Sequence, residues 1–265
     1  SDVYKRQALP TPFVDELLAL TTNHTTGSLA SGDCTVVRSP FVEDALGAVG
    51  NGTEADVDEA FRIARSAQKD WAAKPVADRV KAMEQFHKSV VKRQDLLADL
   101  VQLETGKDRT AAFDEVLDVL NNARYYANNA AGFLSTKRRA GAFPVITSTR
   151  EQRFPKGVVG QISPWNYPLA LGVSDAIPAL LAGNAVVAKP DSTTPFSAII
   201  AKKLLTNAGL PHDVFQIVTG SGKVVGQAIA QQCDYLMFTG STATGKLLGK
   251  VVGERLVGYL SLIHI

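Results

Sequence analysis

The chain has little of several things on which particular folds and functions depend. Its 265 residues include two cysteines, Cys34 and Cys233, which allow one disulfide at most and indicate reduced thiols of a cytoplasmic protein. The four histidines show no metal-ligand spacing. A net charge of +2 supplies no basic field for nucleic acid. No apolar run approaches the ~20 residues that span a bilayer. We therefore expect no metal site, no nucleic-acid partner and no membrane partner.

The two ends differ from the ordinary globular composition between them. DVYKRQ at 2–7 and LSLIHI at 260–265 can be encoded by one DNA element in opposite orientations, because codons for one are the reverse complement of codons for the other. The element resembles a transposon end used to fragment DNA for sequencing. We therefore interpret residues 1–7 and 260–265 as adapter-derived, set them aside, and expect a longer parent protein.

Residues 8–142 are predicted to be mostly helical. Thr53 begins a capping-box pattern, and apolar residues recur at helical spacing from Val57 to Trp71. A second helix is predicted over residues 75–106 and a third over residues 113–134. The spacing of their apolar positions indicates core packing.

Two further patterns follow along the chain. Residues 143–157 are rich in β-branched residues and polar on both faces, which predicts an extended arm or hairpin. Residues 158–259 alternate short apolar runs with helical stretches, which predicts βαβ units and a parallel sheet covered on both faces. Ligands bind such sheets at the carboxyl ends of the strands. The candidate ligand-binding loops are therefore SPWNYP, KPDSTTP, TGSGKVVG and FTGSTATG.

The glycine-rich loops are ambiguous when each is taken alone. Gly240 to Lys246 fits G-x-x-x-x-G-K, but Leu247 stands where a phosphate loop needs Ser or Thr for magnesium, which weakens a phosphohydrolase interpretation. The loop has two interpretations. The helix N-terminus that follows it suits a phosphate, or the loop is a glycine-rich turn that binds no ligand. Gly222 and Gly226 belong to a near miss of the dinucleotide fingerprint.

Two side chains in the other loops have a functional and an ordinary interpretation. Lys189 ends a predicted buried strand, so its ammonium either is solvated, the usual case, or has an anionic or hydroxylic partner. Asn166, held between two prolines, can offer its amide N–H to an oxyanion. More commonly such an asparagine bonds to its own turn.

In combination the loops are far more specific. PWNYP, GNAVVAKPDSTTP, GLPHDVFQIVTGSG and FTGSTATG, in this order and with LETGK at 103–107, resemble the aldehyde dehydrogenase superfamily from about Thr53 to Tyr259. Several stretches resemble its actinobacterial NADP-type succinate-semialdehyde dehydrogenases. The resemblance implies an α/β fold with a Rossmann-type parallel sheet and flanking helices. Residues 8–142 would form the helical part of the dinucleotide-binding domain, 143–157 a β-arm of the oligomerisation element, and 158–259 the NAD(P)-binding core.

The resemblance also implies a reaction and a site. An aldehyde, foremost succinate semialdehyde, would be oxidised to a carboxylic acid by NADP+, or by NAD+. Asn166 would donate to the oxyanion, and Lys189 would bond the ribose of the cofactor. Ser192 stands where NAD-preferring relatives often carry Glu, so we expect NADP to be preferred. The implied cofactor-binding residues are Trp165, Asn166, Lys189, Pro190, Asp191, Ser192, Gly222, Gly226, Gly240 and Ser241.

Two motifs of that superfamily do not occur in the printed sequence. They are E-L-G-G-K, with the general base, and G-Q-x-C, with the nucleophile, and neither cysteine nor Glu254 lies in such a motif. We therefore expect a fragment that lacks the catalytic domain and is inactive. We also expect it to be poorly soluble, because its arm exposes an unpaired strand edge. Its parent would be a homodimer or homotetramer. The alternatives are a dehydrogenase for another aldehyde and a short nucleotide-binding or structural protein without activity.

Overall fold

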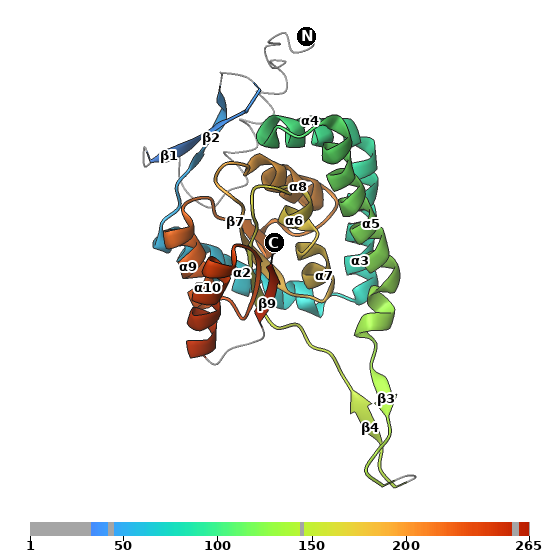
Figure 1. The fold of residues 1–265 in the computed structure, drawn as a ribbon. Coiled ribbons are helices and arrows are strands. Elements are labelled where there is room, and N and C mark those ends of the chain that lie inside the picture. Colours follow the sequence, from blue (N-terminus) through green and yellow to red (C-terminus); the bar gives the residue numbers. More distant parts are fainter. Residues whose placement is uncertain (1–32, 42–44, 144–145, 256–259, 265) are drawn as a thin grey trace.

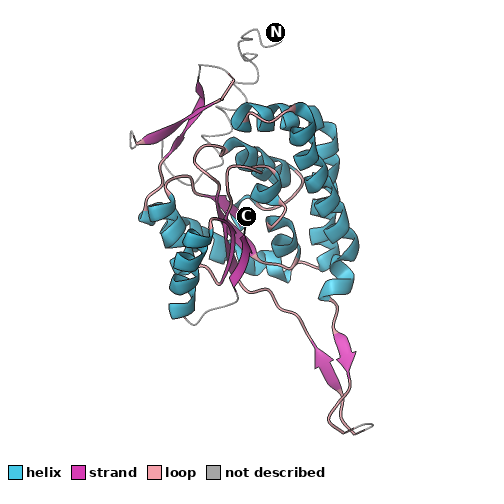
Figure 2. Cartoon of the chain, in the orientation of Figure 1, coloured by secondary structure: helices cyan, strands magenta, loops and turns pink. Residues whose placement is uncertain are grey.

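The fold is a parallel sheet between layers of helices, with a long hairpin extending from the body (Figures 1 and 2). A computed structural model describes residues 33–41, 45–143, 146–255 and the backbone of 260–264. Residues 1–7, which we interpreted as adapter-derived, lie outside the described residues. No helix in the described part of the chain combines the length and the hydropathy needed to cross a membrane.

The first half is helical as predicted, with two differences. The expected helix over residues 75–106 is wrong, because α3 (Val76–Lys92) and α4 (Gln94–Thr105) are separate helices. They part at Arg93, whose φ of −117° and ψ of 21° leave the helical region. The structure also contains an antiparallel pair that the sequence did not predict, β1 (Cys34–Arg38) and β2 (Ala45–Gly50).

Helices α2 and α5 begin where side chains satisfy their first N–H groups. Thr53 accepts a hydrogen bond from the Asp56 N–H, and the Asp56 side chain accepts one from the Thr53 N–H, which confirms the capping box of α2 (Glu54–Ala73). Asp108 caps α5 (Arg109–Leu134) by accepting from the Ala111 N–H.

Four parallel strands form the predicted core of the sheet. They are β5 (Val158–Ile162), β6 (Ala185–Lys189), β7 (Phe215–Ile217) and β8 (Tyr235–Gly240). The order in the sheet is β7-β6-β5-β8-β9. The chain therefore changes its direction of winding between β5 and β8, which is where doubly wound sheets place their ligands.

The segment at the chain's C-terminal end joins this sheet. β9 (Leu260–His264) runs parallel to β8, with Leu236 opposite Leu260 and Gly240 opposite His264. The sheet therefore extends beyond residue 259, where we had predicted that the core ends. The edge of β8 offers unpaired N–H and C=O groups, which an apolar segment in extended form can satisfy. The adapter origin of this segment stays a prediction.

Helices cover both faces of the sheet. α6 (Ala170–Val173), α7 (Ala176–Leu181) and α8 (Phe196–Asn207) pack between the sheet and the layer formed by α3, α4 and α5 (Figure 1). α9 (Gln227–Gln232), α10 (Thr242–Glu254) and α2 lie on the opposite side.

Three side-chain contacts fix the amino ends of β5 and β8. The Asn184 side-chain oxygen accepts from the N–H groups of Lys156 and Gly157, at 2.6 and 3.1 Å. Asp234 accepts from the Val158 N–H at 2.8 Å. Gly157 has a φ of 126°, and a Cβ there would lie 2.3 Å from the Asp234 carboxylate, so this close approach requires glycine.

The arm is a hairpin that starts earlier than predicted. β3 (Lys137–Arg139) pairs antiparallel with β4 (Thr149–Glu151), so the predicted first residue, 143, is too late. The chain leaves the helix at Ser135, which has an extended backbone, and a hairpin needs a strand on each side of its turn. Large apolar side chains on the arm are exposed, namely Phe143, Ile146 and Phe154.

Arg79 on α3 binds the C-terminal ends of two helices. Its guanidinium is buried and donates to the carbonyl groups of Leu181 at 2.8 Å, Ala72 at 3.1 Å and Lys74 at 2.5 Å. Leu181 ends α7, and the other two carbonyls lie at the end of α2. A cation placed there satisfies acceptors that a helix terminus leaves without partners.

We expect Arg79→Met to lower the free energy of unfolding by about 2–4 kcal/mol, because it leaves buried carbonyl groups without donors. Denaturant unfolding of the chain measures this. Arg62→Met is the matched control: Arg62 pairs with Glu59 on an exposed helix surface, where water screens the pair, so its loss should lower the free energy of unfolding far less. Equal losses in the two variants would contradict the role given to Arg79.

Candidate functional site

The four candidate loops meet at one edge of the sheet. They follow β5, β6, β7 and β8, and parallel strands place their carboxyl ends together. The Ser163 N–H, after β5, donates to the Lys189 carbonyl at 3.2 Å, and the Val218 N–H, after β7, donates to the Ala188 carbonyl at 2.9 Å. The predicted convergence of the loops is therefore present.

Lys189 lies beneath this edge rather than in solvent. It is buried, and its Nζ donates to the Pro190 carbonyl at 2.9 Å. Burial lowers the pKa of Lys189, and the charge of Asp191 opposes that shift. The usual expectation of a solvated lysine head is thus wrong here, and the partner is a neutral carbonyl. An ammonium has three N–H donors, so a ligand hydroxyl or phosphate can take up others.

The next two residues hold the loop together. The Asp191 carboxylate accepts from the Thr193 N–H at 2.9 Å and from the Thr193 hydroxyl at 2.7 Å, so it folds onto its own turn. The Ser192 hydroxyl donates to the Gly220 carbonyl at 2.9 Å, which joins the loops after β6 and β7. In this arrangement the Ser192 oxygen remains an acceptor, and its hydrogen reaches a ligand only if that bond opens.

The loop after β8 ends in a helix start that suits an anion. The Ser241 hydroxyl accepts from the Thr244 N–H at 3.3 Å and caps α10, which has 13 residues. Further N–H groups of a first helical turn have no partner within the helix, and the helix dipole favours a negative group there. A Cβ at Gly240 would lie 2.7 Å from the Phe238 ring, so a larger residue where the strand ends would force that ring to move.

Of the two candidate glycines after β7, Gly222 faces open space and Gly226 is buried. Gly222 and Gly226 bound a short π-helical turn whose start is capped by Ser221. A Cβ at Gly222 would meet nothing within 4 Å, and one at Gly226 would lie 3.8 Å from Cδ of Lys189. Packing within the protein therefore does not demand glycine at either position.

The loop after β5 presents Trp165 and Asn166. Trp165 is 58% exposed. The Asn166 side-chain oxygen is buried and has no hydrogen-bond partner among the described residues. The commoner interpretation, in which that oxygen bonds to the turn itself, is thus not realised. A buried polar atom without a partner is costly, and such atoms mark places where a ligand or water completes the bonding.

A buried ionic contact that was not predicted from the sequence lies behind this loop. Glu115 of α5 accepts from the N–H groups of Leu169 and Ala170, at 3.0 and 3.1 Å, where α6 begins. Its other oxygen lies 2.5 Å from Nζ of Lys107, and that Nζ lies 3.7 Å from the centroid of the Tyr167 ring. Burial raises the pKa of Glu115, and the hydrogen bond from Lys107 opposes that shift.

A second buried carboxylate that was not predicted bonds to the start of α8, directly after the loop that follows β6. Glu104 of α4 accepts from the Phe196 N–H at 2.6 Å and from the Ser197 N–H at 2.9 Å, where α8 begins. Burial raises the pKa of Glu104 to about 7 in spite of these bonds. The sequence does carry a signal, because Glu104 follows Leu97 and Val101 at helical spacing on a buried face.

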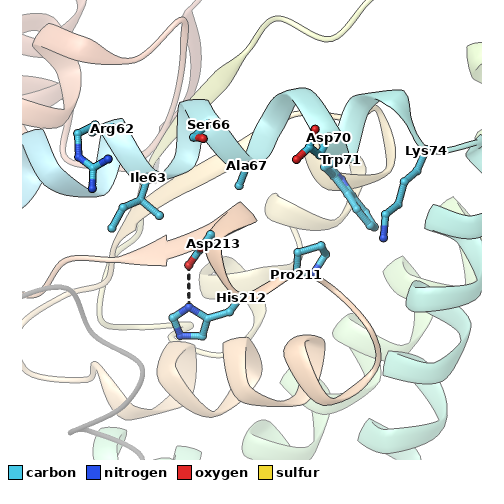
Figure 3. A pocket seen from close by; sticks show the side chains of 10 residues that line it. All are labelled: Arg62, Ile63, Ser66, Ala67, Asp70, Trp71, Lys74, Pro211, His212 and Asp213. Atoms are coloured by element: carbon cyan, nitrogen blue, oxygen red, sulfur yellow. Dashed lines mark hydrogen bonds and ion pairs between the residues drawn. The ribbon is translucent and has the colours of Figure 1, made fainter.

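A groove of about 440 Å³ with both polar and apolar lining lies elsewhere, between α2 and the 3-10 turn His212–Val214 (Figure 3). That turn directly precedes β7, so the groove is at the amino end of the strand, opposite the four loops. In Figure 3 the His212 ring is paired with Asp213, at 3.0 Å. Within the described ranges, no group of three His, Cys, Asp or Glu is placed to hold a metal ion.

The buried state of Glu104 predicts a pH dependence. Its pKa of about 7 in the folded chain exceeds the ordinary value of 4.5. This group therefore contributes stability that is fully present below about pH 4.5 and is lost as the pH rises through about 7. Glu104→Gln cannot ionise at this position. We therefore expect its free energy of unfolding, minus that of the unaltered chain, to rise by about 3 kcal/mol from pH 4.5 to pH 8. Denaturant unfolding across this range measures it, with the difference at pH 4.5 as the reference. A difference that does not vary with pH would contradict it.

The sequence matches known proteins over most of its length. Residues 29–261 match the sequence profile of the aldehyde dehydrogenase family. A protein of Mycolicibacterium smegmatis, provisionally named succinate-semialdehyde dehydrogenase (NADP+), is 52% identical over 223 residues, which are 84% of this chain and 43% of that protein. A protein of Mycobacterium tuberculosis with a similar provisional name is 48% identical over 83% of this chain and 42% of its own length. The chain thus spans less than half the length of these relatives.

Solved structures share the fold. An aldehyde dehydrogenase from Brucella melitensis superposes with a TM-score of 0.87 at 28% identity, over 97% of this chain and 53% of that one. Betaine aldehyde dehydrogenase from Staphylococcus aureus, in complex with NAD+, gives 0.85 at 26% identity, over 95% of this chain and 52% of its own. With the profile matched over most of its residues and the doubly wound sheet in place, the chain belongs to the aldehyde dehydrogenase family.

Proposed function

We propose that this chain is the cofactor-binding part of an enzyme that oxidises succinate semialdehyde to succinate with NADP+. The observation that carries the proposal is the meeting of four loops at one sheet edge, above the buried Lys189 and beside the open start of α10. The names of the mycobacterial relatives support the aldehyde and the cofactor. The NAD+ complex of a structural relative supports the kind of ligand.

The residues at this edge suit the parts of a dinucleotide. The first N–H groups of α10, with Gly240 and Ser241, would receive the pyrophosphate. Lys189, oriented by its bond to the Pro190 carbonyl, would donate to a ribose hydroxyl. The turn from the exposed Gly222 to the buried Gly226 would take the adenine. The bound cofactor would supply the hydride acceptor.

Asn166 and Trp165 would serve the reacting end of the site. The Asn166 amide would donate to the aldehyde oxygen as negative charge develops there, an interaction that typically stabilises a transition state by about 3 kcal/mol. Trp165, exposed on the same loop, would lie beside the cofactor. Asp191 would act indirectly, since its carboxylate holds the turn that follows Lys189.

Neither cysteine of this chain suits the role of nucleophile. Cys233 is buried at the amino end of β8, away from the loops, and burial raises the pKa of its thiol, which disfavours the reactive thiolate. Cys34 is exposed on β1. We therefore propose that the nucleophile and the general base belong to a part of the parent enzyme that the printed sequence lacks, and that this chain alone is inactive.

The arm is proposed to bind another copy of the parent enzyme, in a homodimer or homotetramer. Its short strands β3 and β4 pair with each other, and each leaves an outer edge. The exposed Phe143, Ile146 and Phe154 add apolar surface. Surfaces of this kind are typical of segments that pair with a partner chain.

Cofactor preference tests the proposal directly. Isothermal calorimetry of the chain should show tighter binding of NADP+ than of NAD+, and Ser192→Glu should weaken NADP+ binding by about tenfold because a carboxylate repels the 2′-phosphate. Ser192→Gln, which has the same shape without the charge, is the matched control and should keep the NADP+ preference. Tighter binding of NAD+ by the unaltered chain would contradict the cofactor assignment.

A further inference from the structure

Two buried glutamates bond to the backbone just after the two loops that carry Lys189 and Asn166. One is Glu104, in the LETGK motif at 103–107, and the other is Glu115. Glu104 accepts hydrogen bonds at the start of α8, after the loop that follows Lys189. Glu115 accepts hydrogen bonds at the start of α6, after the loop that carries Asn166. The end of α4 and the first part of α5 therefore anchor the helix starts that follow two loops of the site.

Lys107 is the cation of this anchor. Its Nζ lies 2.5 Å from the Glu115 carboxylate and 3.7 Å from the centroid of the Tyr167 ring. The Lys107 side chain is 18% exposed and that of Glu115 is fully buried, so water screens this contact little. Gly106, with a φ of 78°, ends α4 in the left-handed region and directs the chain to Lys107.

These contacts hold the backbone on the C-terminal side of Asn166. Tyr167 directly follows Asn166, and its ring stacks against the Lys107 ammonium. The bonds from Leu169 and Ala170 to Glu115 fix the end of the same loop. Trp165 and Tyr167 are 58% and 47% exposed, so packing alone holds this part of the loop weakly.

We propose that Lys107 is a positioning residue for Asn166 and Trp165. Its ammonium holds the Tyr167 ring and neutralises Glu115, and so fixes the loop between β5 and α6. The consequence for ligand binding rests on the function proposed above, whereas the anchoring of the loop is independent of it. A loop held in one arrangement aims the Asn166 amide and spares the ligand the entropy of ordering it.

Tyr167 gives the sharpest test, because it is half exposed and its replacement leaves the Lys107–Glu115 ion pair in place. Tyr167→Leu removes the ring face, and Tyr167→Phe keeps it. Hydrogen–deuterium exchange of the whole chain should be faster by about two- to fivefold for residues 165–171 in Tyr167→Leu, the factor that corresponds to a partly exposed cation–π contact. In Tyr167→Phe the exchange should match the unaltered chain. Unchanged exchange in Tyr167→Leu would overturn the proposal.

Lys107→Met should also accelerate hydrogen exchange of residues 165–171, whereas Lys81→Met should not. Lys81 pairs with Asp78 on an exposed surface and is the matched control. The start of α8, held by Glu104, serves as the internal reference, and its exchange should not change in either variant. Glu104→Gln should accelerate exchange at the start of α8 and leave that of residues 165–171 unchanged. Equal acceleration at both helix starts in Tyr167→Leu would indicate a general loss of stability and overturn the positioning role.

Binding of NADP+ provides the second readout. Calorimetry should show a dissociation constant raised by about two- to fivefold in Tyr167→Leu and restored in Tyr167→Phe. An unchanged dissociation constant in Tyr167→Leu would overturn the effect of Lys107 on the ligand. If the unaltered chain binds no NADP+, the proposed function fails, and the exchange experiment alone then decides whether Lys107 positions the loop.

Discussion

Two buried carboxylates join the outer helices to the starts of α6 and α8, the helices that cover one face of the sheet. An isolated carboxylate in the interior is strongly unfavourable, so Glu104 and Glu115 are tolerated because each receives N–H groups that would otherwise lack partners. The layer of α3, α4 and α5 is thereby held in a defined position against α6 and α8. Because these two helices directly follow the loops of the site, the position of the loops depends on the same bonds.

The sheet and its loops were predictable from the sequence because their patterns are local. Uniformly apolar runs such as AVVAK can be satisfied in few ways other than as buried parallel strands. The loops then follow from strand direction alone. The capping box at Thr53 is likewise a pattern of four residues, and both of its bonds are present.

What the sequence did not predict depends on distant partners or on small backbone changes. The break at Arg93 alters one residue's dihedral angles without interrupting the apolar periodicity. The pairing of β1 with β2 involves strands of mixed exposure. The bonds of Glu104 and Arg79 reach residues 92 and 102 positions away. The partner of Lys189 is a backbone carbonyl, which no side-chain pattern reveals.

The separation of these partners along the chain has a consequence for synthesis. The helices up to α5 are synthesised before residues 169–197, so Glu104, Glu115 and Arg79 at first lack the bonding partners that lie in this later stretch. The outer helices therefore pack against α6, α7 and α8 only after these later helices have been synthesised. Folding is then completed late and through long-range contacts, which makes it slow.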